Sequence, residues 1–224
     1  MKTSEPAQRV PWLALTAGAL SWLLSSAPAD LQRRCALVRG AWAAEPWRLW
    51  TGHLVHFGAA HLRGDLIAFV VWAALLEQRD RRTLASIVFG APPLLSLALL
   101  AGYPGLSEYR GLSGLDCSLV VALISQRGFA NARFRWLGPA CLVAFALKCV
   151  WEITEGRALL APDLGGGAQL LPMAHVLGAV LGAVLQLQAH HVRCRARSSY
   201  ATAPNRALGL GELARTRRRS AARL

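Results

Sequence analysis

Long apolar stretches alternate with short charged segments along the chain, and this pattern predicts six membrane-spanning helices. A helix that crosses a bilayer needs roughly 20 mostly apolar residues. The candidate stretches are Trp12–Ala27, His53–Leu76, Thr83–Leu100, Leu112–Ser125, Trp136–Trp151 and Leu170–Gln188. The fourth is short and begins with a glycine-rich turn, so we expect it to start part-way into the membrane, where irregular backbone needs protein or a water-filled cavity around it.

The composition agrees with an all-α membrane protein. Hydrophobic residues make up 54% of the 224 residues, and charged residues only 17%, whereas soluble domains carry roughly a quarter charged residues. We expect one compact six-helix domain over residues 12–190, between an N-terminal tail at 1–11 and a basic C-terminal tail at 191–224.

The distribution of positive charge predicts the topology. A net charge of +13 could indicate nucleic-acid binding, but the arginines gather in a few short loops and in the tail. Seventeen of the 25 Lys and Arg residues fall in segments that would share one side of the membrane, against six on the other. Positively charged loops stay in the cytoplasm. We therefore expect both termini in the cytoplasm, a tail that contacts anionic lipid, and no nucleic-acid partner.

The N-terminus allows an alternative reading. Lys2 and Arg9, followed by an apolar run and Ala27-Pro28-Ala29, also fit a cleavable signal peptide. Cleavage would leave five helices. The outer loop that follows, Pro28–Thr51, contains three tryptophans, which favour the membrane interface, so we expect this loop to lie on the outer surface.

The start of the fourth stretch carries a candidate nucleophile. The sequence Gly111-Leu112-Ser113-Gly114 places a serine between glycines, which permit a tight turn and a close approach of backbone. The first N–H groups of a helix have no partner within it and can bind an anion. A helix-capping serine is the simpler structural alternative.

The sixth stretch carries a candidate base. His175 is its only histidine, one turn before Gly178, and Gly178 and Gly182 form a small-xxx-small pair that lets another helix approach closely. A helix packed on these glycines would meet the imidazole. A histidine bonded to a neighbouring carbonyl is the alternative.

The second stretch begins with His53, His56 and His61, and His61 shares a helical face with Asp65 four residues later. Three close histidines could suggest a metal site, but no HExxH motif occurs. The five cysteines include no CxxC pair. We therefore predict no metal, no cofactor and no disulfide framework.

Together these motifs supply a serine, a histidine base and donors for an oxyanion. Their order and spacing resemble the rhomboid family of intramembrane serine proteases, over about residues 47–187. The resemblance implies a six-helix core with a Ser–His dyad and no acidic third member. Ser113 would be the nucleophile and His175 the general base, with an oxyanion site formed by His61 and the Ser113 N–H and supported by Gly111, Leu112, Gly114, Asp65 and His56.

The short chain and the run from Trp47 to His56 look most like the rhombosortase branch. That branch is associated with cleaving C-terminal sorting tails, so the expected partners are transmembrane protein substrates. The resemblance, and the lack of an obvious organellar presequence, favour a bacterial inner membrane.

Two residues depart from the family pattern. Asp65 stands where the family usually has Asn, and an ionised carboxylate there would repel an oxyanion. Asp116 lies one turn beyond Ser113. These residues keep open an inactive rhomboid-like protein that binds transmembrane clients. A small transporter with a proton relay is a further alternative, although the third and fifth stretches offer few polar groups apart from Lys148.

Overall fold

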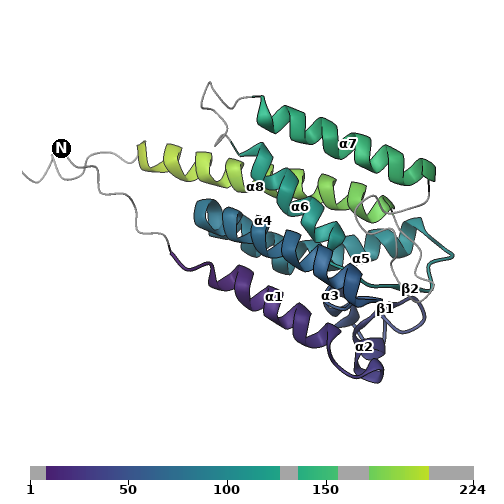
Figure 1. The fold of residues 1–224 in the computed structure, drawn as a ribbon. Coiled ribbons are helices and arrows are strands. Elements are labelled where there is room, and N and C mark those ends of the chain that lie inside the picture. The colour runs from purple at the N-terminus through teal and green to yellow at the C-terminus, as the bar shows by residue number, and fades with distance from the viewer. Residues whose placement is uncertain (1–8, 127–135, 156–171, 202–224) are drawn as a thin grey trace, which may run out of the picture. The chain divides into compact units, whose positions relative to one another are not determined.

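The computed structural model describes residues 9–126, 136–155 and 172–201. The chain divides into two units, residues 1–187 and 188–224. The elements (Figure 1) are α1 (Trp12–Ser25), α2 (Ala29–Cys35), β1 (Leu37–Val38), α3 (Arg48–Thr51), α4 (Ala59–Ala85), the π-helix η1 (Ser86–Gly90), α5 (Ala91–Gly102), β2 (Glu108–Tyr109), α6 (Ser113–Ser125), α7 (Leu137–Glu155) and α8 (Pro172–Ala201).

Most predicted stretches correspond to helices, but several boundaries differ, most of all around the second and third stretches. The second stretch becomes helical at Ala59 rather than at His53, because the preceding residues form turns that end in Gly58, whose backbone is extended (φ −160°). The third stretch follows the second without a loop. Asp80 alone leaves the helical conformation (φ −155°), and its carboxylate accepts bonds from the Thr83 N–H (3.2 Å) and hydroxyl (2.7 Å). Asp80 is therefore an N-cap between two helical segments.

Two helical segments are long and apolar enough to cross a membrane, judged by length and composition over the described ranges. They are Ala59–Gly102, which contains α4, η1 and α5, and Pro172–Arg195 of α8. The apolar helices α1 and α6 are shorter. The count of six spans remains a prediction.

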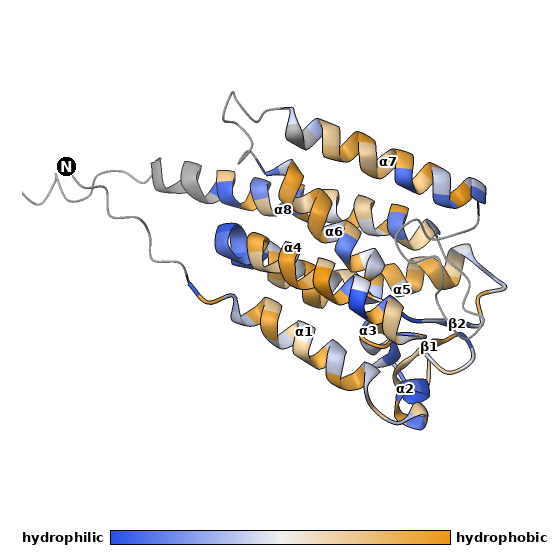
Figure 2. Cartoon of the chain, viewed as in Figure 1, coloured by the Kyte–Doolittle hydropathy of each residue, from blue (hydrophilic) through white to orange (hydrophobic). Residues whose placement is uncertain are grey.

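Many large apolar side chains are exposed on the outside of the helices, and most of α1 and α7 is hydrophobic in Figure 2. Trp22 and Leu23 of α1 are more than half exposed, as are Ile67 of α4 and Leu147 of α7. A soluble monomer rarely exposes so much contiguous apolar surface. This surface is suited to contact with lipid tails.

Helix α4 packs against both α1 and α6. Glu77 of α4 accepts the backbone N–H groups of Leu13 (3.2 Å) and Ala14 (2.9 Å), so a buried carboxylate caps the positive end of α1. Apolar residues of α1, α4 and α6 then form the main core, with Phe69, Leu76, Leu115 and Leu119 among its members.

The segment between α1 and α4 is folded and is anchored by two arginines. Arg48 is buried and donates to the carbonyls of Arg33 (2.7 Å) and Ala36 (2.6 Å). Arg39 reaches across to Leu106 and donates to its carbonyl at 3.1 Å. Strand β1 pairs antiparallel with β2, with Leu37 opposite Tyr109. These contacts fix the chain that leads from β2 into α6.

Candidate active site

Ser113 is the first residue of α6, and the turn before it requires glycine. Gly111 has φ +131°, a conformation that side-chain-bearing residues rarely adopt. A side chain there would also meet the ring of His61 at 3.0 Å. Leu112 then accepts the N–H groups of Leu115 (2.7 Å) and Asp116 (3.0 Å). The glycine turn therefore starts α6 at Ser113, and the turn itself lies against the His61 ring.

Tyr109 of β2 braces this turn from the other side. Its hydroxyl donates to the Gly111 carbonyl at 3.2 Å and also interacts with the Ser113 side chain. Burial raises the pKa of Tyr109, so the phenol keeps its proton at neutral pH. The β1–β2 pairing thus positions a hydrogen-bonding group beside Ser113.

Helix α8 approaches α6 at two glycines, so closely that no side chain fits between them. A Cβ on Gly178 would lie 1.9 Å from the Gly114 carbonyl oxygen, and one on Gly182 would lie 2.2 Å from that of Ser118. The Ser118 hydroxyl donates to the Gly178 carbonyl at 2.7 Å and ties the helices together. The backbones of α6 and α8 are therefore in direct contact at these two glycines.

This contact brings the residue after Ser113 close to the residue before His175. A Cβ on Gly114, the residue after Ser113, would lie 3.1 Å from the carbonyl oxygen of Ala174, the residue before His175. His175 itself is 5% exposed. The described contacts include no direct hydrogen bond between Ser113 and His175, which is common in catalytic pairs without substrate.

His175 contacts a buried acid that the sequence analysis missed. Its Nδ1 lies 2.8 Å from Oε2 of Glu152 on α7, and Lys148 Nζ lies 2.7 Å from the same oxygen. Glu152 is 1% exposed. The predicted fifth stretch ended at Trp151, whereas α7 extends to Glu155. The i,i+4 spacing of Lys148 and Glu152 was the available signal.

A second cluster lies against the glycine turn. Nε2 of His61 and Nε2 of His56 lie 3.2 Å and 3.3 Å from Oδ2 of Asp65. The Leu112 N–H donates to His56 Nε2 at 3.3 Å, and Ser25 contacts His56 Nδ1 at 3.0 Å. The structure therefore brings His56, His61 and Asp65 together beside the residues that precede Ser113.

His53 lies outside this cluster, in the turn before α4. Its Nε2 is 3.0 Å from the Ser96 hydroxyl, and its ring packs edge-on against Tyr109. Complete burial lowers the pKa of His53 to about 4, so its ring is neutral. Its contacts hold α5 against the turn. Over the described ranges, no group of three or more His, Cys, Asp or Glu is arranged to hold a metal ion.

Asp116 is also buried, at 8% exposure, and its Oδ1 has no hydrogen-bond partner among the described residues. It lies one helical turn after Ser113 on α6. Asp116 departs from the pattern of the family that the sequence resembles, and the structure places it in the interior.

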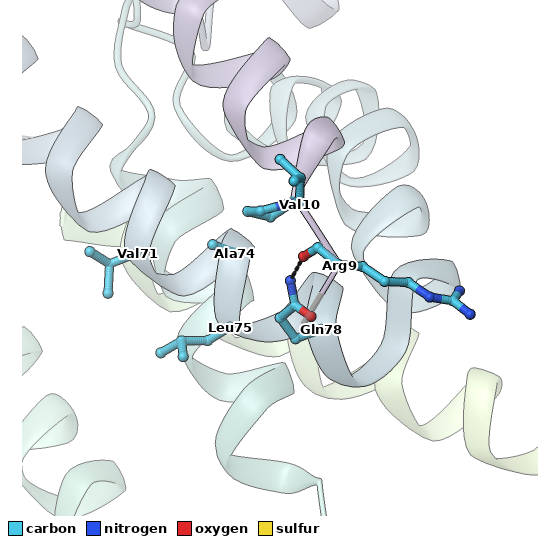
Figure 3. A pocket seen from close by; sticks show the side chains of 7 residues that line it. Arg9, Val10, Val71, Ala74, Leu75 and Gln78 are labelled. Carbon is cyan, nitrogen blue, oxygen red and sulfur yellow. Dashed lines mark hydrogen bonds between the residues drawn. The ribbon is translucent and has the colours of Figure 1, made fainter. Parts of the chain in front are cut away.

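A pocket of about 590 Å³ lies elsewhere, between the start of α1 and the later part of α4 (Figure 3). Arg9, Leu75 and Gln78 line it, and the Gln78 amide donates to the Arg9 carbonyl. At 1.5 Å per helical residue, Leu75 is about 15 Å along α4 from Asp65. The pocket is therefore separate from the serine and histidine clusters.

Comparison with protein families matches the Rhomboid domain over residues 43–191. A comparison with curated proteins finds no significant match. The matched range covers about two thirds of the chain, and includes Ser113, His175 and the His56–His61–Asp65 cluster.

Proposed function

The chain belongs to the rhomboid family, whose members are generally membrane-embedded serine proteases, and from this we propose that it is an intramembrane serine endopeptidase. Its substrates are transmembrane segments of membrane-anchored proteins. Ser113 is the proposed nucleophile and His175 the proposed general base, in a bundle of six membrane-spanning helices.

One observation carries the proposal: α6 and α8 touch at the residues adjoining the two catalytic candidates. Gly114 follows Ser113, and Ala174 precedes His175. The contact at Gly178 lets the backbones of these two helical turns touch. A serine nucleophile is activated by a general base next to it, and histidine is the usual one. The glycines account for the close approach of the helices, and Ser113 and His175 are the polar residues that flank it.

The proposed reaction proceeds by acyl transfer. His175 accepts the Ser113 proton as Oγ attacks the scissile carbonyl, and the oxyanion is met by N–H groups at the start of α6 and by His61. The imidazolium returns the proton to the leaving amine, and water then hydrolyses the acyl-enzyme. Because the Leu112 N–H is already bonded to His56, the available backbone donors begin at Ser113.

We also propose a rhombosortase role, in which the enzyme processes C-terminal sorting tails. The support is the Trp47–His56 run. In the structure, Arg48 of this run is buried, whereas Trp50 is exposed. The Trp50 Nε1–H donates to the Phe89 carbonyl at 2.8 Å. The substrate expected from this role has a glycine-rich motif, a hydrophobic helix and a basic end.

The proposed location is a bacterial inner membrane with both termini in the cytoplasm. The charge distribution supports this orientation. The six-helix domain is proposed for residues 12–190, with a short cytoplasmic tail before it. The basic segment 191–224 would bind anionic lipid headgroups at the cytoplasmic surface.

A catalytically inactive protein that binds transmembrane clients is the second candidate, and Asp65 favours it. Asp65 Oδ2 is 3.2 Å from His61 Nε2, and lies 3.3 Å from where a Cβ on Gly111 would be. A carboxylate that is ionised at this position would oppose the formation of an oxyanion.

The deciding experiment measures cleavage of a transmembrane substrate with a glycine-rich, hydrophobic and basic C-terminal tail, in proteoliposomes. We expect the full-length protein to cleave it, and Ser113→Ala and His175→Ala to fail while remaining folded. Labelling of Ser113 by a fluorophosphonate probe gives an independent readout. Neither cleavage nor labelling by folded wild-type protein, tested also on generic rhomboid substrates, would favour the inactive client-binding protein.

A further inference from the structure

We propose that Glu152 is a positioning residue that orients His175, so that this chain uses a Ser113–His175–Glu152 triad in place of a dyad. The inference rests on the proposed protease function and concerns how its base is held. Glu152 and His175 lie on different helices, α7 and α8, and meet at 2.8 Å.

The contact geometry assigns the proton on the imidazole. An ionised carboxylate can only accept hydrogen bonds, and an ammonium can only donate them. If Nδ1 carried a lone pair, it would face Glu152 Oε2 at 2.8 Å with no proton between the two atoms. The stable arrangement is therefore Nδ1–H donating to Glu152. The lone pair then lies on Nε2, the atom free to accept the Ser113 proton.

Lys148 makes this arrangement compatible with a buried carboxylate. Its Nζ donates to the same oxygen at 2.7 Å and lies 3.4 Å from His175 Nδ1. A charge buried without a partner would become neutral instead, and a protonated Glu152 could donate to Nδ1 and impose the wrong tautomer. Lys148 thus keeps Glu152 an acceptor, and Glu152 in turn stabilises the imidazolium formed during the reaction.

An ion pair that serves only to stabilise α7 is the competing explanation. Lys148 and Glu152 are four residues apart on one helix and could pair without His175. The two explanations differ in what removing the carboxylate does. A structural pair affects folding, whereas a positioning residue affects kcat with little change in KM.

The test uses the full-length protein in proteoliposomes with the sorting-tail substrate, and measures kcat, KM and the rate of fluorophosphonate labelling. For Glu152→Gln we expect kcat and the labelling rate to fall roughly 10- to 100-fold, because the amide does not enforce the Nδ1–H tautomer. KM should stay within about twofold. The matched control is Glu155→Gln, an exposed position on the same helix, which should behave like wild type.

Glu152→Gln leaves the partly buried Lys148 without its carboxylate, so a second variant separates folding from positioning. Lys148→Met combined with Glu152→Gln removes both charges together. We expect the thermal unfolding temperature to recover towards wild type, while kcat remains low because a neutral glutamine at position 152 can turn either its oxygen or its NH2 towards Nδ1 and does not stabilise the imidazolium.

The outcomes distinguish the two proposals. If the double variant regains wild-type kcat, or if Glu152→Gln never loses it, the positioning role is overturned while the protease function stands. If wild type and Ser113→Ala show the same absence of cleavage and labelling, both proposals fall, because no catalytic histidine exists to be oriented. Low kcat in both Glu152 variants with an unchanged KM supports the triad.

Discussion

Two buried clusters of ionisable side chains adjoin Ser113, and they differ in how completely they are bonded. In the His175 cluster, one Glu152 oxygen receives contacts at 2.7 Å and 2.8 Å. In the Asp65 cluster, the distances from Oδ2 to the two histidines are 3.2 Å and 3.3 Å. His61 Nδ1 has no hydrogen-bond partner among the described residues.

This difference matches the proposed roles of the clusters. A general base must hold one tautomer before substrate arrives, so its contacts are expected to be short and complete. A site for an oxyanion is used only when charge develops, so an unpaired imidazole nitrogen such as His61 Nδ1 is expected there in the resting state. The Asp65 carboxylate can only accept hydrogen bonds and adds nothing to that capacity. The four predictions below test this division, from the largest expected effect to the smallest.

Removing each histidine in turn should give the largest contrast. We expect His175→Ala to reduce kcat about 10³- to 10⁴-fold, because the serine loses its base. His61→Ala should cost about 10²-fold, the usual effect of losing one oxyanion donor. Steady-state kinetics in proteoliposomes would measure both, with circular dichroism to verify folding. Equal losses in the two variants would contradict separate roles.

Widening the α6–α8 contact should disturb the His175 cluster through the backbone. A Cβ at Gly178 would meet the Gly114 oxygen at 1.9 Å, so Gly178→Ala must separate the helices. We expect a loss of about 3 kcal/mol in unfolding free energy, measured by denaturation in detergent. Gly64→Ala is the control, since nothing lies within 4 Å of that Cβ. Similar stability of the two variants would refute the close contact.

His53 gives a comparison with a histidine that is buried without a proposed catalytic role. Because burial lowers the pKa of His53 to about 4 from 6.5, its contribution to stability is complete above pH 6.5 and is lost as pH falls towards 4. We expect wild type to lose about 2 kcal/mol between pH 7.5 and pH 5 from this group. Denaturation of His53→Gln at both pH values should show a correspondingly smaller loss; an identical loss would exclude His53 as the source.

Asp65→Asn should have the smallest effect and tests the Asp65 cluster directly. An amide can donate to an oxyanion, whereas a carboxylate cannot. We therefore expect kcat/KM to rise about three- to tenfold, measured with the same substrate. A fall would indicate that Asp65 is needed to orient His61 and His56, with which it is in contact.

The sequence was informative where periodicity and glycine spacing determine the structure. The starts of α1 and α6 lie within one residue of the predicted stretches. The family is confirmed by the Rhomboid match. The roles of Ser113 and His175 remain predictions.

Features that depend on contacts between distant segments could not be read from the chain. The helix start at Ala59 was predicted six residues too early, since apolar residues before it are buried in a turn rather than in a helix. The break at Asp80, whose carboxylate caps the helical segment that follows, was not predicted. Glu152 was missed because its significance depends on α8, which is distant in sequence and meets α7 only in the fold.

The lengths of α1 and α6 have a mechanical consequence for the surrounding bilayer. These helices have 14 and 13 residues, or about 21 Å and 20 Å at the usual rise, whereas the hydrocarbon core is about 30 Å thick. In the proposed six-span arrangement, lipids beside α1 must compress or tilt, at a cost of fractions of a kcal/mol per Å. The protein would then partition towards thinner membranes, and longer acyl chains would place it under elastic stress.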